Sequence, residues 1–263
     1  MDTDAAHILA LFDQQLRRDQ RGERPGDVVE REGGVVRQIG KGDGWCGVVW
    51  SDLDERSADA AIAAQVRRFA ELGRDFEWKL YSHDIPADLG ERLLRAGFVP
   101  EAPEALMVAA IADLPADPNL PEGVRIERVT DVAGVHKAIE AHRLAFGKPS
   151  PRLEQHLLHQ AEHAPEELSA IVVLAGEQPI CSARMEFHEG TSFASLWGGG
   201  TVREWRGKGI YRATVAYRTR LAAERGFTHL QVDASDDSRP ILTRLGFHTL
   251  ATTTPYEYVV SAR

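Results

Sequence analysis

The sequence predicts an α/β protein of the α+β kind with two similar halves, each a mixed, mostly antiparallel sheet flanked by helices. Two observations lead to this prediction. Short runs of alternating or β-branched residues recur along the chain, with stretches of helical periodicity between them. In addition, the order of these runs in residues 45–109 repeats, in weaker form, the order near the C-terminus.

Length and charge limit the kinds of partner that we expect. The chain has 263 residues and 43% hydrophobic content, enough for one large domain or two of ordinary size. Its net charge is -9 and its pI is near 5.6, so the summed field repels polyanions and anionic membranes. We therefore expect a globular protein, monomeric or homodimeric, with no nucleic-acid or membrane partner.

Targeting signals and metal-ligand patterns are missing from the sequence. The N-terminal residues lack a basic segment followed by a long apolar run, and the longest apolar run, residues 170–176, has the length of a strand. Cys46 and Cys181 are far apart, with no Cys or His at metal spacing. These features predict a cytoplasmic protein with no metal and no disulfide.

A proline-rich segment divides the chain. Pro115, Pro118 and Pro121 lie among acidic residues and glycine in residues 111–124, a composition that interrupts both helix and sheet. The predicted domains are residues 1–112 and residues 122–263.

The second half begins with a strand over residues 124–129. Thr130 and Asp131 signal a helix that runs to about Phe146, and a further helix follows over residues 151–163. Three extended runs come next, over residues 168–177, 179–189 and 192–202, with turn-like residues between them. These runs predict an antiparallel meander.

A helix follows the meander. The apolar spacing of Ile210, Thr214, Tyr217 and Leu221 predicts a helix over residues 210–225, which Gly226 ends. A strand over residues 229–235, a short helix over residues 239–245 and a hairpin over residues 246–260 complete the predicted order.

The first half repeats this order without its glycine-rich turn. Residues 45–53 and 76–81 predict strands, and the helix between them begins at Ser57. Residues 86–98 match the short helix of the second half, and residues 104–109 match its last strand. No glycine occurs between Val48 and Leu72, so this half has the scaffold without the turn.

The glycine-rich turn of the second half, "WGGGTVREWRGKGIYRAT", has the features of a phosphate site. A strand that leads through glycines into a helix N-terminus points several backbone N–H groups at one place, where the helix dipole adds positive charge. Between Arg203 and Arg225 there are seven basic and two acidic residues. The glycine spacing is neither that of a P-loop nor that of a Rossmann fold, and the motif alone equally fits a tight turn that binds nothing.

A resemblance favours the phosphate interpretation. "TVREWRGKGIYRATV" resembles the pyrophosphate loop of the GNAT superfamily of N-acetyltransferases, with the pattern Arg/Gln-x-x-Gly-x-Gly/Ala, and "DASDDSRPILTRLGF" resembles the strand and helix that follow it. The resemblance covers the second half and, more faintly, residues 45–109. The chain therefore resembles a tandem GNAT protein whose N-terminal copy is degenerate.

The resemblance implies an enzyme that transfers an acyl group from acetyl-CoA, or a related acyl-CoA, to a primary amine of a small molecule. It places the cosubstrate on Thr201, Val202, Arg203, Arg206, Gly207, Lys208, Gly209, Ile210, Tyr211, Ser235 and Ser238. Backbone N–H groups of residues 206–211 would hold the pyrophosphate, and residues 201–203 would pair with the pantetheine arm. Gly198, Gly199 and Gly200 suit a strand that bulges to admit the thioester, although simple curvature of the sheet is the alternative. Tyr211 departs from the pattern, which has Gly or Ala there.

The acid and base are less defined. Where the family commonly has a tyrosine as acid, this chain has Leu242, so Tyr256 and Ser238 are the candidate substitutes. Glu186 and Asp233 are the candidate bases. If Met185 faces the core, alternation leaves Glu186 merely solvated, and Asp233 equally suits a cap of the following turn.

Three further interpretations stay open. His156, His159 and His163 lie on one helix face, which we assign to a solvated surface or an acceptor pocket rather than to a metal. The missing tyrosine also fits a CoA-sensing or interaction module without catalysis. An aminoacyl transferase that uses charged tRNA is a third class, disfavoured by the acidic net charge.

Overall fold

The computed structural model describes residues 3–22, 26–42, 44–163 and 169–260. The chain forms two compact units that alternate along the sequence. The first unit comprises Met1–Met107, Asp233–Thr243 and His248–Arg263, and the second comprises Val108–Val232 and Arg244–Phe247. The C-terminal segments thus group with the N-terminal half, and the domain bounds expected from the sequence, 1–112 and 122–263, stay a prediction.

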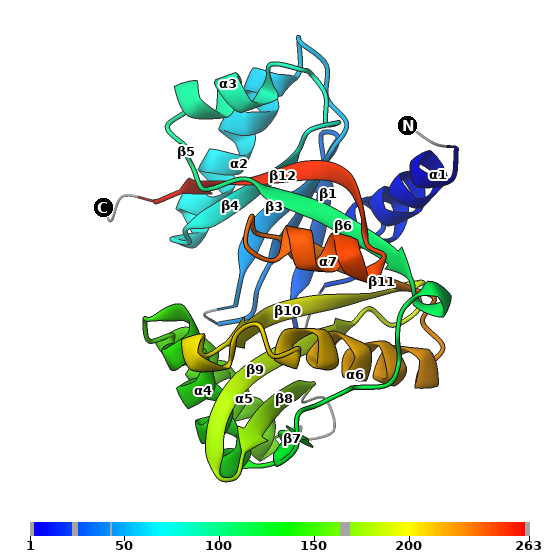
Figure 1. Ribbon diagram of the computed structural model, residues 1–263. Helices are drawn as coiled ribbons and strands as arrows, with labels where there is room; N and C mark the ends of the chain where they lie inside the picture. Colours follow the sequence, from blue (N-terminus) through cyan, green and yellow to red (C-terminus); the bar gives the residue numbers. More distant parts are fainter. Residues whose placement is uncertain (1–2, 23–25, 43, 164–168, 261–263) are drawn as a thin grey trace. The chain divides into compact units, whose positions relative to one another are not determined.

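The first unit holds a sheet with the strand order β1-β2-β3-β4-β12 (Figure 1). β3 and β4 are parallel, and the other neighbours in this order are antiparallel. Its elements are α1 (Thr3–Phe12), the π-helix η1 (Asp13–Arg18), β1 (Val28–Glu32), β2 (Val35–Ile39), β3 (Cys46–Ser51), α2 (Ala58–Leu72), β4 (Phe76–Tyr81), α3 (Leu89–Arg95), β5 (Val99–Pro100), the first residues of β6 (Glu104–Ala110) and β12 (His248–Tyr258).

The last strand corrects one expectation. Instead of a hairpin over residues 246–260, the chain forms the single strand β12, which pairs with β4 from Thr253↔Tyr81 to Tyr258↔Phe76. Residues 249–257 contain no Gly, Asn or Asp, the residues at which a tight hairpin turn forms. The run therefore continues as one extended strand.

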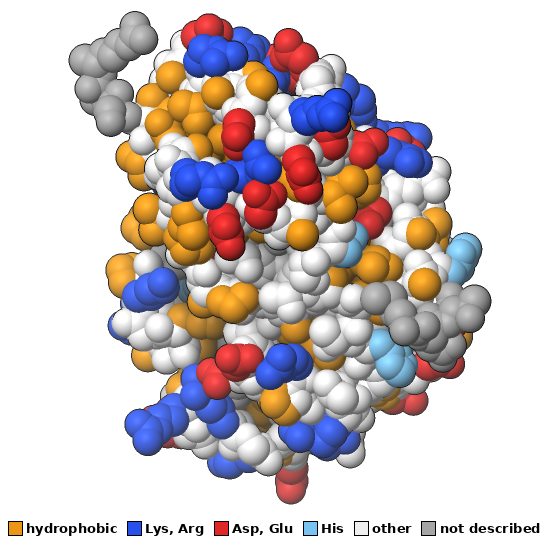
Figure 2. All heavy atoms as spheres, turned by 90° about the horizontal axis from the view of Figure 1, so that it is seen from above, with side chains coloured by type: hydrophobic (Ala, Val, Ile, Leu, Met, Phe, Trp, Pro, Cys, Tyr) orange, Lys and Arg blue, Asp and Glu red, His pale blue; other side chains and the backbone are white. Residues whose placement is uncertain are grey.

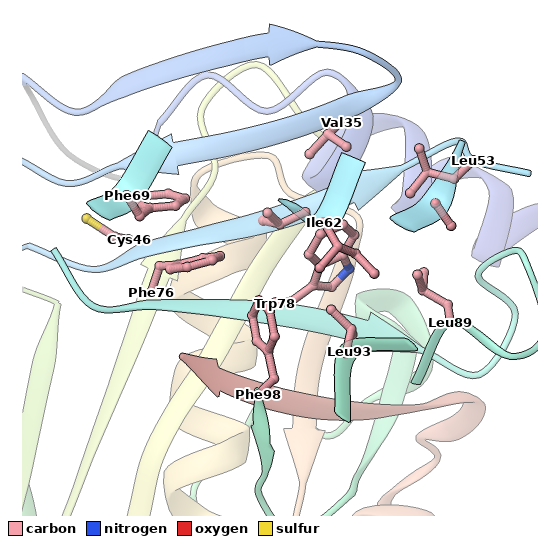
Figure 3. Packing of buried hydrophobic residues seen from close by; sticks show 12 residues of the cluster. Val35, Cys46, Leu53, Ile62, Phe69, Phe76, Trp78, Leu89, Leu93 and Phe98 are labelled. Carbon is pink, nitrogen blue, oxygen red and sulfur yellow. The ribbon is translucent and has the colours of Figure 1, made fainter. Parts of the chain in front are cut away.

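The core of the first unit lies between α2, α3 and the sheet. Phe69 of α2 stacks on Phe76 of β4 with ring centroids 4.1 Å apart, and Phe98 meets the edge of Phe76 at 5.3 Å. Trp78 and Ile62 complete this layer, and all five side chains are buried (Figure 3). Alternation in β4 and helical spacing in α2 thus point the aromatic side chains inward.

Sequence reasoning missed the N-terminal elements of the first unit. The helix α1 was not expected, nor was the hairpin β1–β2, although Gly33 and Gly34 lie between two valine pairs in the pattern of a two-residue turn. Both glycines have positive φ, 59° and 78°, which L-residues rarely adopt.

The second unit confirms the expected meander. β7, β8, β9 and β10 pair as successive antiparallel neighbours, and β11 joins β10 in parallel. Its elements are η2 (Ile111–Asp113), β7 (Val124–Arg128), α4 (Val132–Phe146), α5 (Pro151–His163), β8 (Ala170–Ala175), β9 (Gln178–Phe187), β10 (Phe193–Thr201), the 3-10 turn η4 (Arg203–Trp205), α6 (Ile210–Glu224) and the first residues of β11 (His229–Ala234). The short helix α7 (Arg239–Leu245) passes from the first unit into the second.

The buried face of α6 differs in part from the expected one. Ile210 and Thr214 are buried as expected, whereas Tyr217 and Leu221 are only half-buried. Arg218 and Ala222 occupy the interior instead. The buried positions 218 and 222 each lie one residue after the expected positions 217 and 221. A charged residue such as Arg218 is not expected on a buried helix face, so the periodicity favoured Tyr217.

Three features of the folded chain concern its surroundings: the surface charges, the two cysteines and the hydropathy of the helices. On the face in Figure 2, Lys and Arg side chains are interspersed with Asp and Glu. Cys46 and Cys181 are both buried and free. Within the described ranges, no helix is long and apolar enough to cross a membrane.

A chain of hydrogen bonds that begins at His188 connects the meander to β11. His188 Nε2 lies 2.7 Å from Ser195 Oγ, and the Ser195 hydroxyl donates to Gln231 Oε1 at 2.7 Å. Since Ser195 donates to glutamine, Nε2 carries the proton of the neutral imidazole and donates to the serine. Burial lowers the pKa of His188 to about 4.

This histidine makes the stability of the protein depend on pH. Protonation is easier in the unfolded chain, so stability is full above the unfolded pKa and is lost as the pH falls towards the folded pKa. Between about pH 7 and pH 5 we expect His188 to remove about 2 kcal/mol of unfolding free energy. Urea denaturation should show this loss in the wild type and a smaller one in His188→Gln. The exposed His248→Gln serves as control, and an equal pH dependence in all three proteins contradicts the assignment.

Candidate functional site

The strand β10 changes its pairing where its glycines lie. Trp197 pairs with Arg184 and Gly200 with Ser182, so that Gly198 and Gly199 together face one residue of β9. Gly198 has a φ of 55°, in the left-handed region. Glycines in a strand mark such bulges, and the expected bulge is therefore present.

The other edge of β10 opens at the same place. Among the described residues, β10 pairs with β11 over Phe193–Ser195. β10 itself continues to Thr201 on the β9 side, where Val202 N donates to Ile180 O at 2.9 Å. Within the described ranges, no strand pairing is found beyond Ser195 for the edge of β10 that faces β11.

The bulge glycines allow two helices to approach β10 from opposite faces. A Cβ on Gly199 would lie 2.8 Å from the Tyr211 ring of α6, and a Cβ on Gly200 would lie 2.5 Å from the Phe146 ring of α4. Real Cβ contacts are essentially never this short. The ring of Tyr211, which stands where the family pattern has a small residue, therefore fits because Gly199 leaves room for it.

The turn before α6 has unused hydrogen-bond donors. Gly207 and Gly209 adopt left-handed φ values of 76° and 81°, and no side chain caps the helix at Gly209. The backbone N–H groups of residues 207–212 have no acceptor among the described residues. Such a row of donors at a helix N-terminus has the geometry that suits an anion.

In the turn before α2 of the first unit, a side chain of the turn accepts hydrogen bonds from backbone N–H groups. Asp54 Oδ1 accepts hydrogen bonds from Arg56 N at 3.0 Å and Ser57 N at 2.7 Å, ahead of α2. A carboxylate of the chain thus satisfies donors that the second unit leaves open.

Two basic side chains shape the turn itself. Arg206 Nε donates to Thr201 O at 3.0 Å, and its Nη2 donates to Ala145 O at 3.1 Å, which ties the turn to β10 and α4. Lys208 Nζ lies 4.4 Å from the centroid of the Trp205 ring. Together with the exposed Arg203, these cations give the turn a positive potential.

Three predicted cosubstrate residues belong to the interior beside the turn. Thr201 and Val202 are buried, and the Thr201 hydroxyl donates to Cys181 Sγ at 3.4 Å. Ile210 packs with Cys181 in a small buried cluster against which Trp205 rests. These contacts fix the end of β10 and the start of α6 relative to each other.

A buried arginine lies next to the bulge. Arg218 of α6 is 1% exposed, donates from Nε to Thr214 O at 3.0 Å and donates from Nη1 to Arg184 O at 2.9 Å. Burial raises the pKa of its neighbour Tyr211, an effect that the Arg218 charge partly offsets. Burial also raises the pKa of Cys181, to about 11.

Of the candidate bases, Glu186 lies in the second unit. It is half-buried on β9, opposite Ser195 of β10. Met185 is buried on the other face, and Phe187 packs against Phe227 with ring centroids 5.4 Å apart. Alternation thus holds as expected, and the role of Glu186 as a base stays a prediction.

Asp233, the other candidate base, forms an ion pair with Lys79 of β4 in the first unit. Both side chains are largely buried, at 3% and 19% exposure. Burial alone would lower the pKa of Lys79, but the charge of Asp233 and the neighbouring Tyr81 and Glu77 raise it well above its usual value. The role of Asp233 as a base stays a prediction.

The remaining predicted site residues lie in the first unit. Tyr256 packs against its hydrophobic core, with its hydroxyl oxygen 2.7 Å from the position of a Cβ on Gly90. Ser235 Oγ and Ser238 Oγ are 3.3 Å apart in the turn before α7, and Leu242 is fully buried. The structure therefore gathers residues 201–211 and Glu186 in one unit and assigns Asp233, Tyr256 and the two serines to the other.

The histidine face of α5 forms no metal site in the part of the chain that the structure describes. The rings of His159 and His163 stack with centroids 4.3 Å apart. No group of three or more His, Cys, Asp or Glu side chains with metal-binding geometry occurs within the described ranges.

Sequence reasoning missed Arg218 and Lys79. Arg218 follows Ile210 and Thr214 at helical spacing, so a basic residue on the buried face was the available signal. Lys79 carries no such signal, because its partner Asp233 is 154 positions away in the sequence.

Comparisons with known proteins agree with this geometry. No protein-family model matches the chain, and no curated protein matches it. Among solved structures, a GCN5-related N-acetyltransferase from Kribbella flavida is similar with a TM-score of 0.68 and 20% identity, over 98% of this chain and 96% of that one. A tandem GNAT protein from the clavulanic acid biosynthesis pathway is similar with a TM-score of 0.61 and 12% identity, over 100% and 97%. A GCN5-related N-acetyltransferase from Sphaerobacter thermophilus gives 0.60 and 14%, over 87% and 78%.

The chain therefore has the fold of the GCN5-related N-acetyltransferases. The match to a tandem GNAT protein extends over the whole chain, including the half without the glycine turn.

The contact between Gly199 and Tyr211 is testable. Gly199→Ala should lower the unfolding free energy by about 1–3 kcal/mol, because the new methyl group overlaps the tyrosine ring. In a Tyr211→Ala background the same change should cost almost nothing, which a double-mutant cycle of urea unfolding measures. Equal costs in both backgrounds would show that the ring does not occupy this space.

Proposed function

We propose that this protein is an acyl-CoA-dependent N-acyltransferase that binds acetyl-CoA, or a related acyl-CoA, in its second unit and acylates a primary amine of a small molecule. The observation that carries the proposal is the row of unsatisfied N–H groups at residues 207–212, beside a bulged, open-edged strand in a GNAT fold.

The turn suits a pyrophosphate group. Several N–H donors, the N-terminal end of α6 and nearby basic side chains all favour a compact dianion. Gly207 and Gly209 have nothing within 4 Å of a Cβ position, so ligand atoms are able to approach the backbone there. Arg206 supports this arrangement from the side by bonding Thr201 O and Ala145 O.

The open edge of β10 suits the pantetheine arm. An extended chain with amide groups pairs with a free strand edge in the manner of an added strand. Residues 201–203 lie between the bulge and the turn, so that a ligand held by its phosphates at the turn would reach the bulge with its thioester end.

The reaction needs an unprotonated amine held close to the thioester. Glu186 and Asp233 are the candidate bases, and Asp233 is held in an ion pair with Lys79. For the acid, Tyr256 and Ser238 stay as the candidates because Leu242 offers no proton. Thiolate is a fair leaving group, so positioning and electrostatic stabilisation supply much of the rate.

A second candidate function is a CoA-binding sensor or interaction module without catalysis. The buried Leu242, at the place of the usual acid, is the observation that favours it. Thiol release from acetyl-CoA in the presence of a broad amine panel separates the two. Turnover with any amine removes the sensor, and tight CoA binding without turnover supports it.

The turn offers a matched pair of variants at Gly207. Asn and Asp tolerate left-handed φ better than other residues and differ from each other by little except charge. In calorimetric titrations with acetyl-CoA, Gly207→Asp should bind about tenfold or more weakly than Gly207→Asn, because its carboxylate repels the pyrophosphate and competes for the N–H groups. Absence of heat from the wild type would end the binding claim, and equal affinities for both variants would move the pyrophosphate away from this turn.

A further inference from the structure

The buried guanidinium of Arg218 lacks a negative partner in the described part of the chain. Its Nε and Nη1 donate to two backbone carbonyls, and its Nη2 is buried with no hydrogen-bond partner. The titratable groups that act on it are Tyr211 and Cys181. Both are neutral near pH 7, because burial raises the pKa of each.

Such a charge is costly unless it has a use. A buried ion without a counter-ion destabilises the folded state. Arg218 donates a hydrogen bond to Arg184 O, next to the bulge. This bond requires a donor but not a positive charge, because the neutral amide of Gln or Asn would donate as well. A buried guanidinium without a counter-ion is suited to bind an anionic ligand.

The unpartnered nitrogen faces the bulge. Nη2 lies 3.5 Å from the position of a Cβ on Gly199, on the same face as the Tyr211 ring. Arg184, whose carbonyl holds the other amino group, pairs with Trp197 at the start of the bulge. The donor thus points at the residues that, under the proposed function, receive the thioester end of the cosubstrate.

We propose that Arg218 binds the sulfur end of coenzyme A in its anionic, thiolate form. This inference rests on the proposed function, because it takes the ligand at the turn to be an acyl-CoA. In the family, a tyrosine at the position of Leu242 commonly protonates the leaving thiolate. Here the charge of Arg218 would stabilise that thiolate instead.

The chemistry gives such a group a role. When an amine nitrogen attacks the thioester carbon, a C–N bond forms and the C–S bond breaks, with its electron pair remaining on sulfur. The amine loses one proton to the base or to water, so the products are an amide, a CoA thiolate and a proton. A preorganised cation beside the sulfur favours this step without a proton donor.

The test compares binding of coenzyme A with binding of desulfo-coenzyme A, which lacks the sulfur, as a function of pH. If Arg218 faces the sulfur, wild-type affinity for coenzyme A should rise relative to desulfo-coenzyme A by about tenfold between pH 6 and pH 8.5, since a charge-assisted contact lowers the pKa of the bound thiol. In Arg218→Met this relative gain should disappear, whereas desulfo-coenzyme A should bind as in the wild type.

Arg220→Met is the matched control, because it removes the same charge from the same helix at a residue whose side chain is 43% exposed. It should retain the wild-type pH profile. Arg218→Gln keeps side-chain N–H donors for the carbonyls and guards against misfolding of the Met variant, and it should also lose the thiolate preference.

A rate measurement gives a second readout. Hydroxylamine is largely unprotonated at neutral pH and needs no base, so thiol release from acetyl-CoA with hydroxylamine reports on the departure of sulfur. It should fall by about tenfold to a hundredfold in Arg218→Gln and stay unchanged in Arg220→Met.

The outcomes separate the two proposals. If the wild type binds neither ligand, the proposed function fails. If it binds both ligands and the pH profiles of wild type and Arg218→Gln coincide, the assignment of Arg218 is overturned and the proposed function stands.

Discussion

The break in pairing at Gly198 and Gly199 is the constraint on which the rest of the second unit depends. Two consecutive residues opposite one residue of β9 deflect β10, and its partnership with β11 ends a few residues earlier. Glycines favour this geometry, since Gly198 has a left-handed φ and Gly199 lies against the Tyr211 ring. The open edge, the approach of α6 and the placing of Arg218 all follow from that deflection.

The turns before α2 and before α6 differ in whether their backbone N–H groups have acceptors within the described chain. Before α6, the N–H groups of residues 207–212 have no acceptor among the described residues, whereas before α2 the carboxylate of Asp54 accepts from Arg56 N and Ser57 N. The difference is chemical rather than topological, because both turns join a strand to a fifteen-residue helix. A self-capped turn stabilises its helix, and an uncapped turn keeps its donors for an anion.

Local patterns in the sequence predicted most of the elements but not all of their pairings. Phe76 and Trp78 alternate as a half-buried strand, Ile62 and Phe69 share a helix face, and the three runs of the meander are separated by turn residues, so each was found. The lack of Gly, Asn and Asp in residues 249–257 was the local signal against a hairpin there, but the pairing of β12 with β4, about 175 positions earlier, leaves no local trace. The glycine-rich turn before α6 was visible because it is one contiguous segment of the sequence. Arg218 and the ion pair of Lys79 with Asp233 were not predicted from the sequence. Their burial and their contacts arise only in the folded chain.

The central claim is that residues 207–212 are the donors that an acyl-CoA occupies. Hydrogen–deuterium exchange of the protein with and without acetyl-CoA tests it most directly, because each amide reports on its own acceptor. The account predicts that acetyl-CoA slows exchange at residues 207–212 by about tenfold or more and leaves residues 54–58 of the first unit unchanged. Unchanged exchange at residues 207–212 with bound acetyl-CoA, or protection at residues 54–58 in their place, would contradict it.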